Sequence, residues 1–179
     1  MTTGGLSGVL QNRHDRVVEI LYGVCRAHRS YKDVFADHVN ARFKPIEIPW
    51  SDGGAHSYHF KPDVWARYAD RKVDVIEVWD EQSEAGGIQD MTLTAITPGL
   101  ESMTIICFDQ SAVEKAKELA GVVLSSVHNS RGGFLLDPTE VMRQTVLVPE
   151  KFQSDDAAIK SLLKEGLAPV WARHRRLQA

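Results

Sequence analysis

The fold that this sequence predicts rests on one stretch: HFKPDVWARY (residues 59–68), then ADRK (69–72), then VDVIEVWD (73–80). The first and third segments are rich in β-branched and aromatic residues, and the segment between them has the length of a hairpin loop. Side chains alternate between the faces of a strand, so Glu77 and Trp79 share the face opposite to that of Val78. The stretch therefore predicts a β-hairpin that can bring Asp63 close to Glu77.

These two acids are the side chains that a hard divalent cation prefers, because Mg²⁺ binds oxygen ligands. We therefore expect Asp63 and Glu77 to form a site for Mg²⁺ or Mn²⁺. In the alternative arrangement, both acids flank a solvated sheet edge or pair with Arg67 and Arg71.

The composition of the chain indicates one ordinary globular domain. The 179 residues are 43% hydrophobic and 25% charged, which suits a single domain with a sizeable core. The formal net charge is −3, whereas a basic nucleic-acid-binding module carries the opposite sign. Any contact with DNA is therefore expected through a local patch, a metal ion or a partner subunit.

The rest of the composition favours a cytoplasmic, soluble protein without a membrane segment. Residues 1–8 form a short tail without the apolar core of a signal peptide, and no apolar stretch approaches the length of a bilayer crossing. Cys25 and Cys107 lie inside apolar runs and are expected to be buried free thiols.

Helical and strand patterns alternate along the remaining chain. Residues 9–28 predict a helix, residues 31–43 continue it or form a second helical piece, and residues 44–50 predict a strand bounded by prolines. The later elements are a helix over 88–96, a strand over 103–109, a helix over 111–127, a strand over 145–148, and a helix from Ser154 to the C-terminus that Pro169 breaks or kinks. Residues 51–55 and 129–133 are loops by composition.

This order predicts an α/β fold, with a mixed central β-sheet flanked by helices. We expect a flexible tail over residues 1–8 and one α/β domain over 9–150. A C-terminal helical extension over 151–179 is expected to pack on the same domain.

With Pro62 and Asp63 on one strand and Glu77, Val78 and Trp79 on the next, the chain resembles the PD-(D/E)XK nuclease superfamily. The resemblance covers roughly residues 9–127 and implies a restriction-endonuclease-like αβββαβ core. It also implies metal-dependent hydrolysis of phosphodiester bonds in DNA, with Asp63 and Glu77 as ligands of Mg²⁺.

Trp79 stands where that family has a lysine that positions or activates the attacking water. An indole offers one N–H donor and no positive charge, so it cannot stabilise charge that develops on a phosphate. Lys61, two residues before Asp63 and expected on the same strand face, is the preferred replacement. Lys72 in the turn is less well placed, and a metal ion acting alone is the third alternative.

Further residues complete the expected site. As in some members of the family, an additional acid would come from Glu19 on the first helix or Glu47 on the first strand. Gln89 on the following helix would contact water or phosphate. The basic cluster near the C-terminus is a solvated helix end, or it contacts a phosphate backbone or an acidic partner; it consists of Arg173, Arg175 and Arg176.

Three functions stay open at this point. The first is a metal-dependent endonuclease that acts on DNA. The second is a catalytically inactive nuclease-fold subunit, a scaffold or nucleic-acid-binding component of a larger complex, in which Trp79 fills the space of the lysine. The third is an α/β domain of another class whose hairpin mimics the motif. The expected partners are DNA and either a second copy of the chain or a larger protein complex.

Overall fold

The structure is a computed structural model that describes residues 4–39, 43–49, 57–80, 83–126 and 137–177. Its strands are β1 (Tyr31–Ala36), β2 (Ile46–Pro49), β3 (Ser57–Phe60), β4 (Val64–Tyr68), β5 (Val73–Trp79), β6 (Leu100–Cys107) and β7 (Thr145–Leu147). Its helices are α1 (Gly4–Arg26), α2 (Glu84–Ala95), α3 (Gln110–Leu119), α5 (Pro138–Arg143) and α6 (Asp156–Leu177), with a π turn η1 (Ala120–Leu124) and a 3₁₀ turn η2 (Glu150–Phe152).

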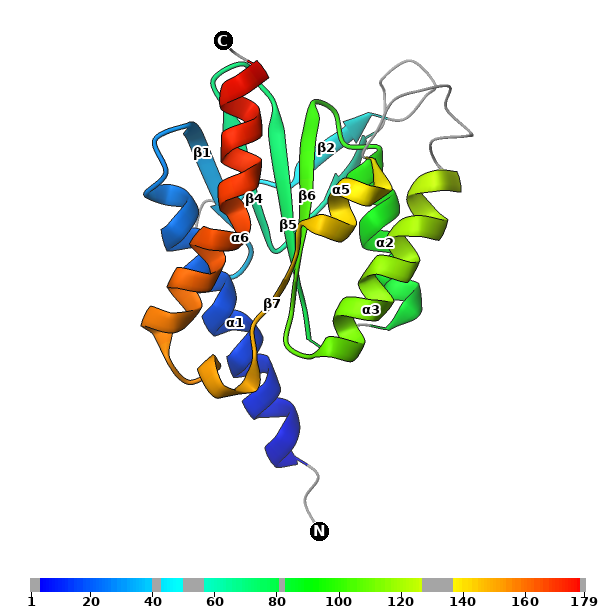
Figure 1. The fold of residues 1–179 in the computed structure, drawn as a ribbon. Helices are drawn as coiled ribbons and strands as arrows, with labels where there is room; N and C mark the ends of the chain where they lie inside the picture. The colour runs from blue at the N-terminus through cyan, green and yellow to red at the C-terminus, as the bar shows by residue number, and fades with distance from the viewer. Residues whose placement is uncertain (1–3, 40–42, 50–56, 81–82, 127–136, 178–179) are drawn as a thin grey trace.

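Five strands form one mixed sheet in the order β1-β4-β5-β6-β7. The strands β1, β4 and β5 are antiparallel neighbours, while β6 runs parallel to β5 and β7 runs parallel to β6. Helix α2 connects β5 to β6, as a parallel pair requires. The predicted α/β fold with a mixed sheet between helices is therefore confirmed (Figure 1).

Helices cover both faces of this sheet. On one face α1 and α6 pack over Ile76 and Val78 of β5, and on the other α2 and α3 pack over Trp79 and over Ile105 of β6. The alternation predicted for β5 is confirmed, because its odd and even residues belong to different hydrophobic clusters. The C-terminal helix α6 packs against α1 and so belongs to the same body (Figure 1).

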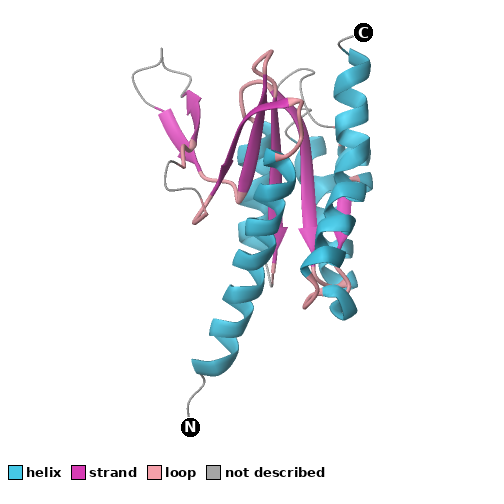
Figure 2. Ribbon diagram, turned by 90° about the vertical axis from the view of Figure 1, so that its left-hand side faces the viewer, coloured by secondary structure: helices cyan, strands magenta, loops and turns pink. Residues whose placement is uncertain are grey.

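The helical piece predicted over residues 31–43 was wrong, whereas the strand predicted over 44–50 is present but lies outside the main sheet. Residues 31–36 are strand β1 rather than helix, because their backbone completes the edge of the sheet beside β4, with Val34 opposite Ala66. Residues 44–50 contribute β2, which pairs with β3 in a separate two-stranded hairpin inserted between β1 and β4. Figure 2 shows this hairpin standing apart from the main sheet.

The run 59–68 also forms two strands instead of one. Residues 61–63 link β3 to β4, and Pro62 lacks the N–H that a continuous strand would need for its ladder. The predicted loop over 69–72 does join β4 to β5. Helix α1 begins at Gly4, so residues 4–8 of the expected tail are helical, and α6 continues through Pro169. The loops predicted over 51–55 and 129–133 lie outside the described residues.

A buried polar network ties α6 to the sheet at the end of β5 that carries the turn. The carboxylate of Asp74 accepts hydrogen bonds from the hydroxyls of Tyr31 (2.7 Å), Tyr68 (2.5 Å) and Ser102 (2.6 Å). Trp171 Nε1 on α6 donates to the Tyr31 hydroxyl at 2.9 Å. The network thus joins four strands and one helix around a single buried carboxylate.

Within the described ranges, no helix combines the length and the apolar character that a membrane crossing needs. Cys25 and Cys107 are both buried free thiols, as their apolar surroundings predicted.

Candidate functional site

The register of the β4–β5 hairpin brings Asp63 next to Glu77. Val64 lies opposite Ile76 in the last pair of the ladder. One position further along each strand, Asp63 therefore lies opposite Glu77. The backbone N–H of Asp63 donates to Glu77 Oε2 at 3.2 Å, and the N–H of Val78 donates to Asp63 Oδ2 at 2.7 Å. These two bonds close the open end of the ladder, and they hold both carboxylates in defined positions.

Glu77 is a buried carboxylate with one unsatisfied oxygen. Its residue is 4% exposed, and Oε1 has no hydrogen-bond partner among the described residues. Burial, followed by the charges of Asp63 and Asp90, raises the pKa of Glu77 well above its ordinary value of 4.5. A buried carboxylate that faces other acids is held at an energetic cost, which a bound cation would remove.

Asp90 on α2 joins this acidic group. Burial and then the charge of Asp63 raise the pKa of Asp90 from 3.8 to about 6. Helix α2 is the next element after the strand that carries Glu77 and begins at Glu84, so Asp90 lies in its second turn. The neighbouring Gln89 was predicted to belong to the site and Asp90 was not, because the approach of Asp90 to the pair depends on how α2 docks on the sheet.

His14 on α1 is the cationic side chain of the site. Its Nε2 lies 3.3 Å from Asp63 Oδ1, and its Nδ1 lies 3.2 Å from Asp15 Oδ1. The hydrogen bond to Asp63 is the main reason that the pKa of His14 is raised from 6.5 to about 9, against the lowering effect of burial. Sequence reasoning missed His14, because no local pattern links a residue of the first helix to a strand almost fifty positions later.

Trp79 is a packing residue. It is 2% exposed and lies in the hydrophobic cluster with Met91 of α2 and Leu119 of α3. A Cβ on Gly87 would come within 2.9 Å of the indole, so the ring fills the space beside α2 completely. The position that holds the lysine in the PD-(D/E)XK pattern is therefore occupied by an apolar contact.

The structure changes the argument for the two lysines. Lys61 is exposed and lies in the linker between β3 and β4, so the strand alternation that was expected to align it with Asp63 does not apply. Lys72 lies in the turn at the other end of β5, with Nζ 3.5 Å from Glu101 Oε2. Arg67 pairs with Asp33 instead of with either acid of the site.

The three accessory residues lie around the pair without joining it. Glu47 is an exposed residue of β2 on the separate hairpin. Gln89 is exposed on α2, and its Nε2 donates to the Tyr58 hydroxyl at 3.5 Å. Glu19 lines a pocket together with Asp15 and Arg16 of the same helix.

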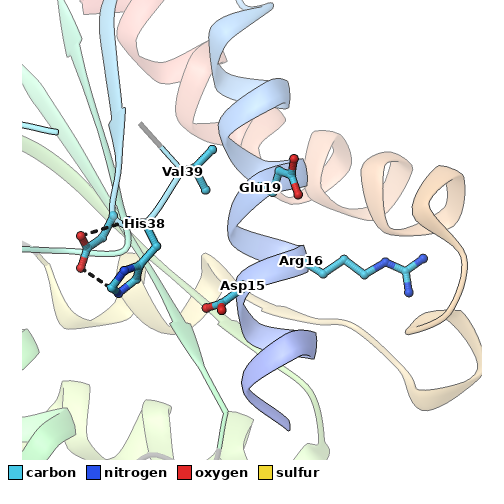
Figure 3. Close-up of a pocket in the computed structure, with 6 residues that line it drawn as sticks. Asp15, Arg16, Glu19, His38 and Val39 are labelled. Carbon is cyan, nitrogen blue, oxygen red and sulfur yellow. Dashed lines mark hydrogen bonds and ion pairs between the residues drawn. The ribbon is translucent and has the colours of Figure 1, made fainter. Parts of the chain in front are cut away.

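This pocket has a volume of about 390 Å³ and lies between α1 and the segment that follows β1 (Figure 3). Its lining residues are Asp15, Arg16, Glu19, Asp37, His38 and Val39. Arg16 points away toward α6, where its Nε donates to Asp156 Oδ1 at 2.6 Å (Figure 3). The remaining wall is mainly acidic, so it does not suit a phosphate group.

The basic cluster lies away from the acids. Arg173 pairs with Glu140 and has Nε 3.9 Å from Glu101 Oε1. Glu101 lies beside the first residues of β5. At about 3.3 Å per strand residue, these first residues are roughly 10 Å from Glu77. Arg175 is exposed, and the side chain of Arg176 lies outside the described part of the chain. The cluster therefore does not contribute to the group around Asp63.

A divalent cation bound at these acids would take few of its ligands from the protein. In the described part of the chain, no set of three or more His, Cys, Asp or Glu side chains is arranged to hold a metal ion. Mg²⁺ commonly binds through one or two carboxylates and completes its shell with water and substrate phosphate. The unsatisfied Glu77 Oε1 and the 22% exposure of the Asp63 side chain match that mode.

Comparison with protein-family models, with curated proteins and with solved structures finds no match to this chain. The structure does bring Asp63 and Glu77 together, and their role as metal ligands stays a prediction.

Proposed function

We propose that this chain is a PD-(D/E)XK-like domain that binds Mg²⁺ or Mn²⁺ through Asp63 and Glu77 and hydrolyses phosphodiester bonds in DNA. One observation carries the proposal: two acids meet at the end of a hairpin, and the buried one has an unsatisfied oxygen and a raised pKa. That combination is expected of a cation site, since a purely structural carboxylate is normally fully hydrogen-bonded.

The connectivity supports the same proposal. Helix α1, the antiparallel strands β1, β4 and β5, helix α2 and the parallel strand β6 follow in the order that the PD-(D/E)XK resemblance implies. Asp63 directly precedes the second of these strands and Glu77 lies on the third, which are the positions that the motif assigns to its acids.

Each residue of the site has a separate role in the proposed function. When bound, a divalent cation would offset the charge of the carboxylates and polarise a phosphate oxygen. The N–H groups of Asp63 and Val78 fix one oxygen of each acid; Asp63 Oδ1 faces His14, and Glu77 Oε1 is left without a hydrogen-bond partner among the described residues. His14 supplies an N–H beside Asp63, and Lys61 adds a positive charge from the exposed linker, in the role that Trp79 cannot fill.

The burial of Trp79 favours a second candidate, a nuclease-fold domain that binds metal or nucleic acid without cleaving it. The indole replaces the lysine with a tightly packed apolar contact, and this stabilises the domain without helping a reaction at phosphorus.

Two measurements on the same variants separate these proposals. The first is the shift in melting temperature on adding Mg²⁺ or Mn²⁺, and the second is cleavage of supercoiled, linear and branched DNA. A ligand at a hundred times its dissociation constant stabilises a protein by about 2.7 kcal/mol, which a melting curve detects. We compare wild type with Glu77→Gln, His14→Gln and Lys61→Ala, and with Glu47→Gln as the matched control for an exposed acid.

Metal-dependent stabilisation and cleavage that Glu77→Gln abolishes and Glu47→Gln retains would support the hydrolase. Stabilisation lost in Glu77→Gln, without cleavage of any substrate, would support the non-catalytic candidate. Absence of both effects in a folded wild-type protein would refute the metal site.

A further inference from the structure

We infer that the inserted β2–β3 hairpin, together with the adjacent turn of α2, binds an unpaired stretch of nucleic acid beside the two acids. We call this area the hairpin surface; it consists of Lys44, Tyr58, Lys61, Ile88 and Gln89. The inference rests on the proposed function, since it supplies the substrate-binding part of the same site.

Tyr58 is the central residue of the hairpin surface. It lies opposite Ile48 in the β2–β3 register, so the two side chains share one face of the hairpin. Ile48 is buried in the cluster that includes Trp65 and Leu93 of α2, which directs this face toward the sheet and α2. Tyr58 nevertheless stays 41% exposed, with its hydroxyl 3.5 Å from Gln89 Nε2. An aromatic ring held at one end and exposed along its body is suited to stack against a base.

A second exposed apolar side chain lies on the same turn of α2. Large exposed hydrophobic residues number three in the described part of the chain, namely Tyr58, Ile88 and Val122. Ile88 is 40% exposed and directly precedes Gln89, the contact of Tyr58. Lys61 of the hairpin surface is joined to Asp63 through Pro62 alone, which places the surface beside the acids.

Positive charge lies at the base of the same hairpin. Lys44 and Lys61 are exposed, and both lie just beyond the last pair of the hairpin, which Ile46 and Phe60 form. Trp65 Nε1 donates to the carbonyl of Lys44 at 2.8 Å, which anchors this base to β4. Lys61 lies two residues before Asp63. Two lysines beside an exposed ring complement a single strand, because phosphates need cations and unpaired bases need stacking partners.

An unpaired strand fits this surface better than a duplex. In a duplex the faces of the bases are stacked on one another, so an exposed tyrosine ring finds no free face to contact. In a single-stranded or splayed region every base offers one. The hairpin forms a sheet of its own beside the main one (Figure 2).

The test measures binding of a fluorescein-labelled dT12 strand, and of a duplex of the same length, by fluorescence anisotropy in EDTA. Metal is absent, so the result is independent of metal binding and cleavage. The variants are Tyr58→Ala, Tyr58→Phe, Ile88→Ala and the double variant Lys44→Ala/Lys61→Ala. The controls are Val122→Ala, the third exposed hydrophobic residue, and Lys164→Ala, an exposed lysine of α6.

We expect wild type to bind dT12 more tightly than the duplex, and Tyr58→Ala to weaken dT12 binding roughly tenfold or more. Tyr58→Phe keeps the ring and should bind like wild type. The double lysine variant should lower the slope of log affinity against log salt by about 1 to 2 units. Melting curves verify that each variant is folded.

Failure of dT12 to bind, or equal loss in Tyr58→Ala and Val122→Ala, would overturn the inference. So would a change in oligomeric state of Tyr58→Ala without a change in DNA affinity, since the surface would then join copies of the chain or another protein. The metal-binding and cleavage measurements on Glu77→Gln test the proposed function independently of the hairpin surface.

Discussion

The contact between His14 and Asp63 makes the stability of the protein depend on pH. The hydrogen bond to Asp63 raises the pKa of His14 from 6.5 to about 9, so folding favours the protonated ring. The stabilising contribution is complete below pH 6.5 and is lost as the pH rises through 9. Solvent screens a quarter-exposed side chain, so we expect a loss of about 1–2 kcal/mol over this range.

We therefore predict that wild type loses more free energy of unfolding than His14→Gln between pH 6.5 and 9.5. Urea unfolding at intervals of half a pH unit, in EDTA, measures this difference. His59→Gln removes an exposed histidine of β3 and should leave the wild-type slope unchanged. Parallel curves for wild type and His14→Gln would contradict the assignment of this contact.

The same contact shows where sequence-based reasoning stops at the level of single residues. Asp63 directly precedes β4 and Glu77 lies on β5, and a short turn joins these strands, so spacing was enough to predict that the two acids approach each other. His14 and Asp90 reach the pair from helices on opposite faces of the sheet. Their contribution depends on how α1 and α2 dock, which no local pattern encodes.

Helix α2 is fixed against β5 by the absence of a side chain at Gly87. Alanine is favoured over glycine inside a helix by about 1 kcal/mol, but here its Cβ would lie 2.9 Å from the ring of Trp79 and 3.0 Å from Leu119. The buried indole is rigid, so relief requires α2 to move. We expect Gly87→Ala to destabilise the protein by about 1–3 kcal/mol, the usual cost of overpacking.

Gly23→Ala is the matched control for that substitution. Gly23 also lies inside a helix, and a Cβ there would meet nothing within 4 Å. This change should stabilise the protein by up to about 1 kcal/mol, since only the helix propensity alters. Thermal melting of both variants tests the pair, and equal effects would mean that Trp79 does not restrict α2.

Elements were predictable where local pattern and tertiary role agree. The apolar run of β6 and the β4–β5 turn are examples. Residues 31–36 carry apolar positions that fit a helix as well as a strand, and the unpaired edge of β4 decides between them. Pro62 gave a readable signal for the break between β3 and β4. The docking of α6 was not encoded locally, and its helix tolerates Pro169 because packing along its length outweighs one missing hydrogen bond.

The hydrogen-bond network around Asp74 acts at the scale of the whole molecule, because it connects strands that are distant in sequence to the last helix. In Tyr31→Phe, Trp171 Nε1 loses its acceptor and Asp74 loses one of three donors. Leaving a buried polar group unsatisfied costs about 1–3 kcal/mol, so we expect a loss of that size in the free energy of unfolding.

Urea unfolding followed by circular dichroism and by tryptophan fluorescence tests this expectation. The two signals should shift together, because α6 and the sheet share the network. Tyr58→Phe removes an exposed hydroxyl and should leave the midpoint within error of wild type. A Tyr31→Phe protein as stable as wild type would show that water replaces the lost partners.

The point where the hairpin is inserted has a wider consequence. The N–H of Asp37 donates to the carbonyl of Asp63 at 2.9 Å, so the chain leaves and rejoins the main sheet at neighbouring backbone positions. Residues 38–62 are thus an insertion between two neighbouring strands of the sheet, and the sheet does not fix the length of this insertion. Doubling the length of such a loop costs only about 0.6 kcal/mol of closure entropy. The sheet that positions Asp63 and Glu77 and the β2–β3 hairpin beside it can consequently change in sequence and length independently of each other.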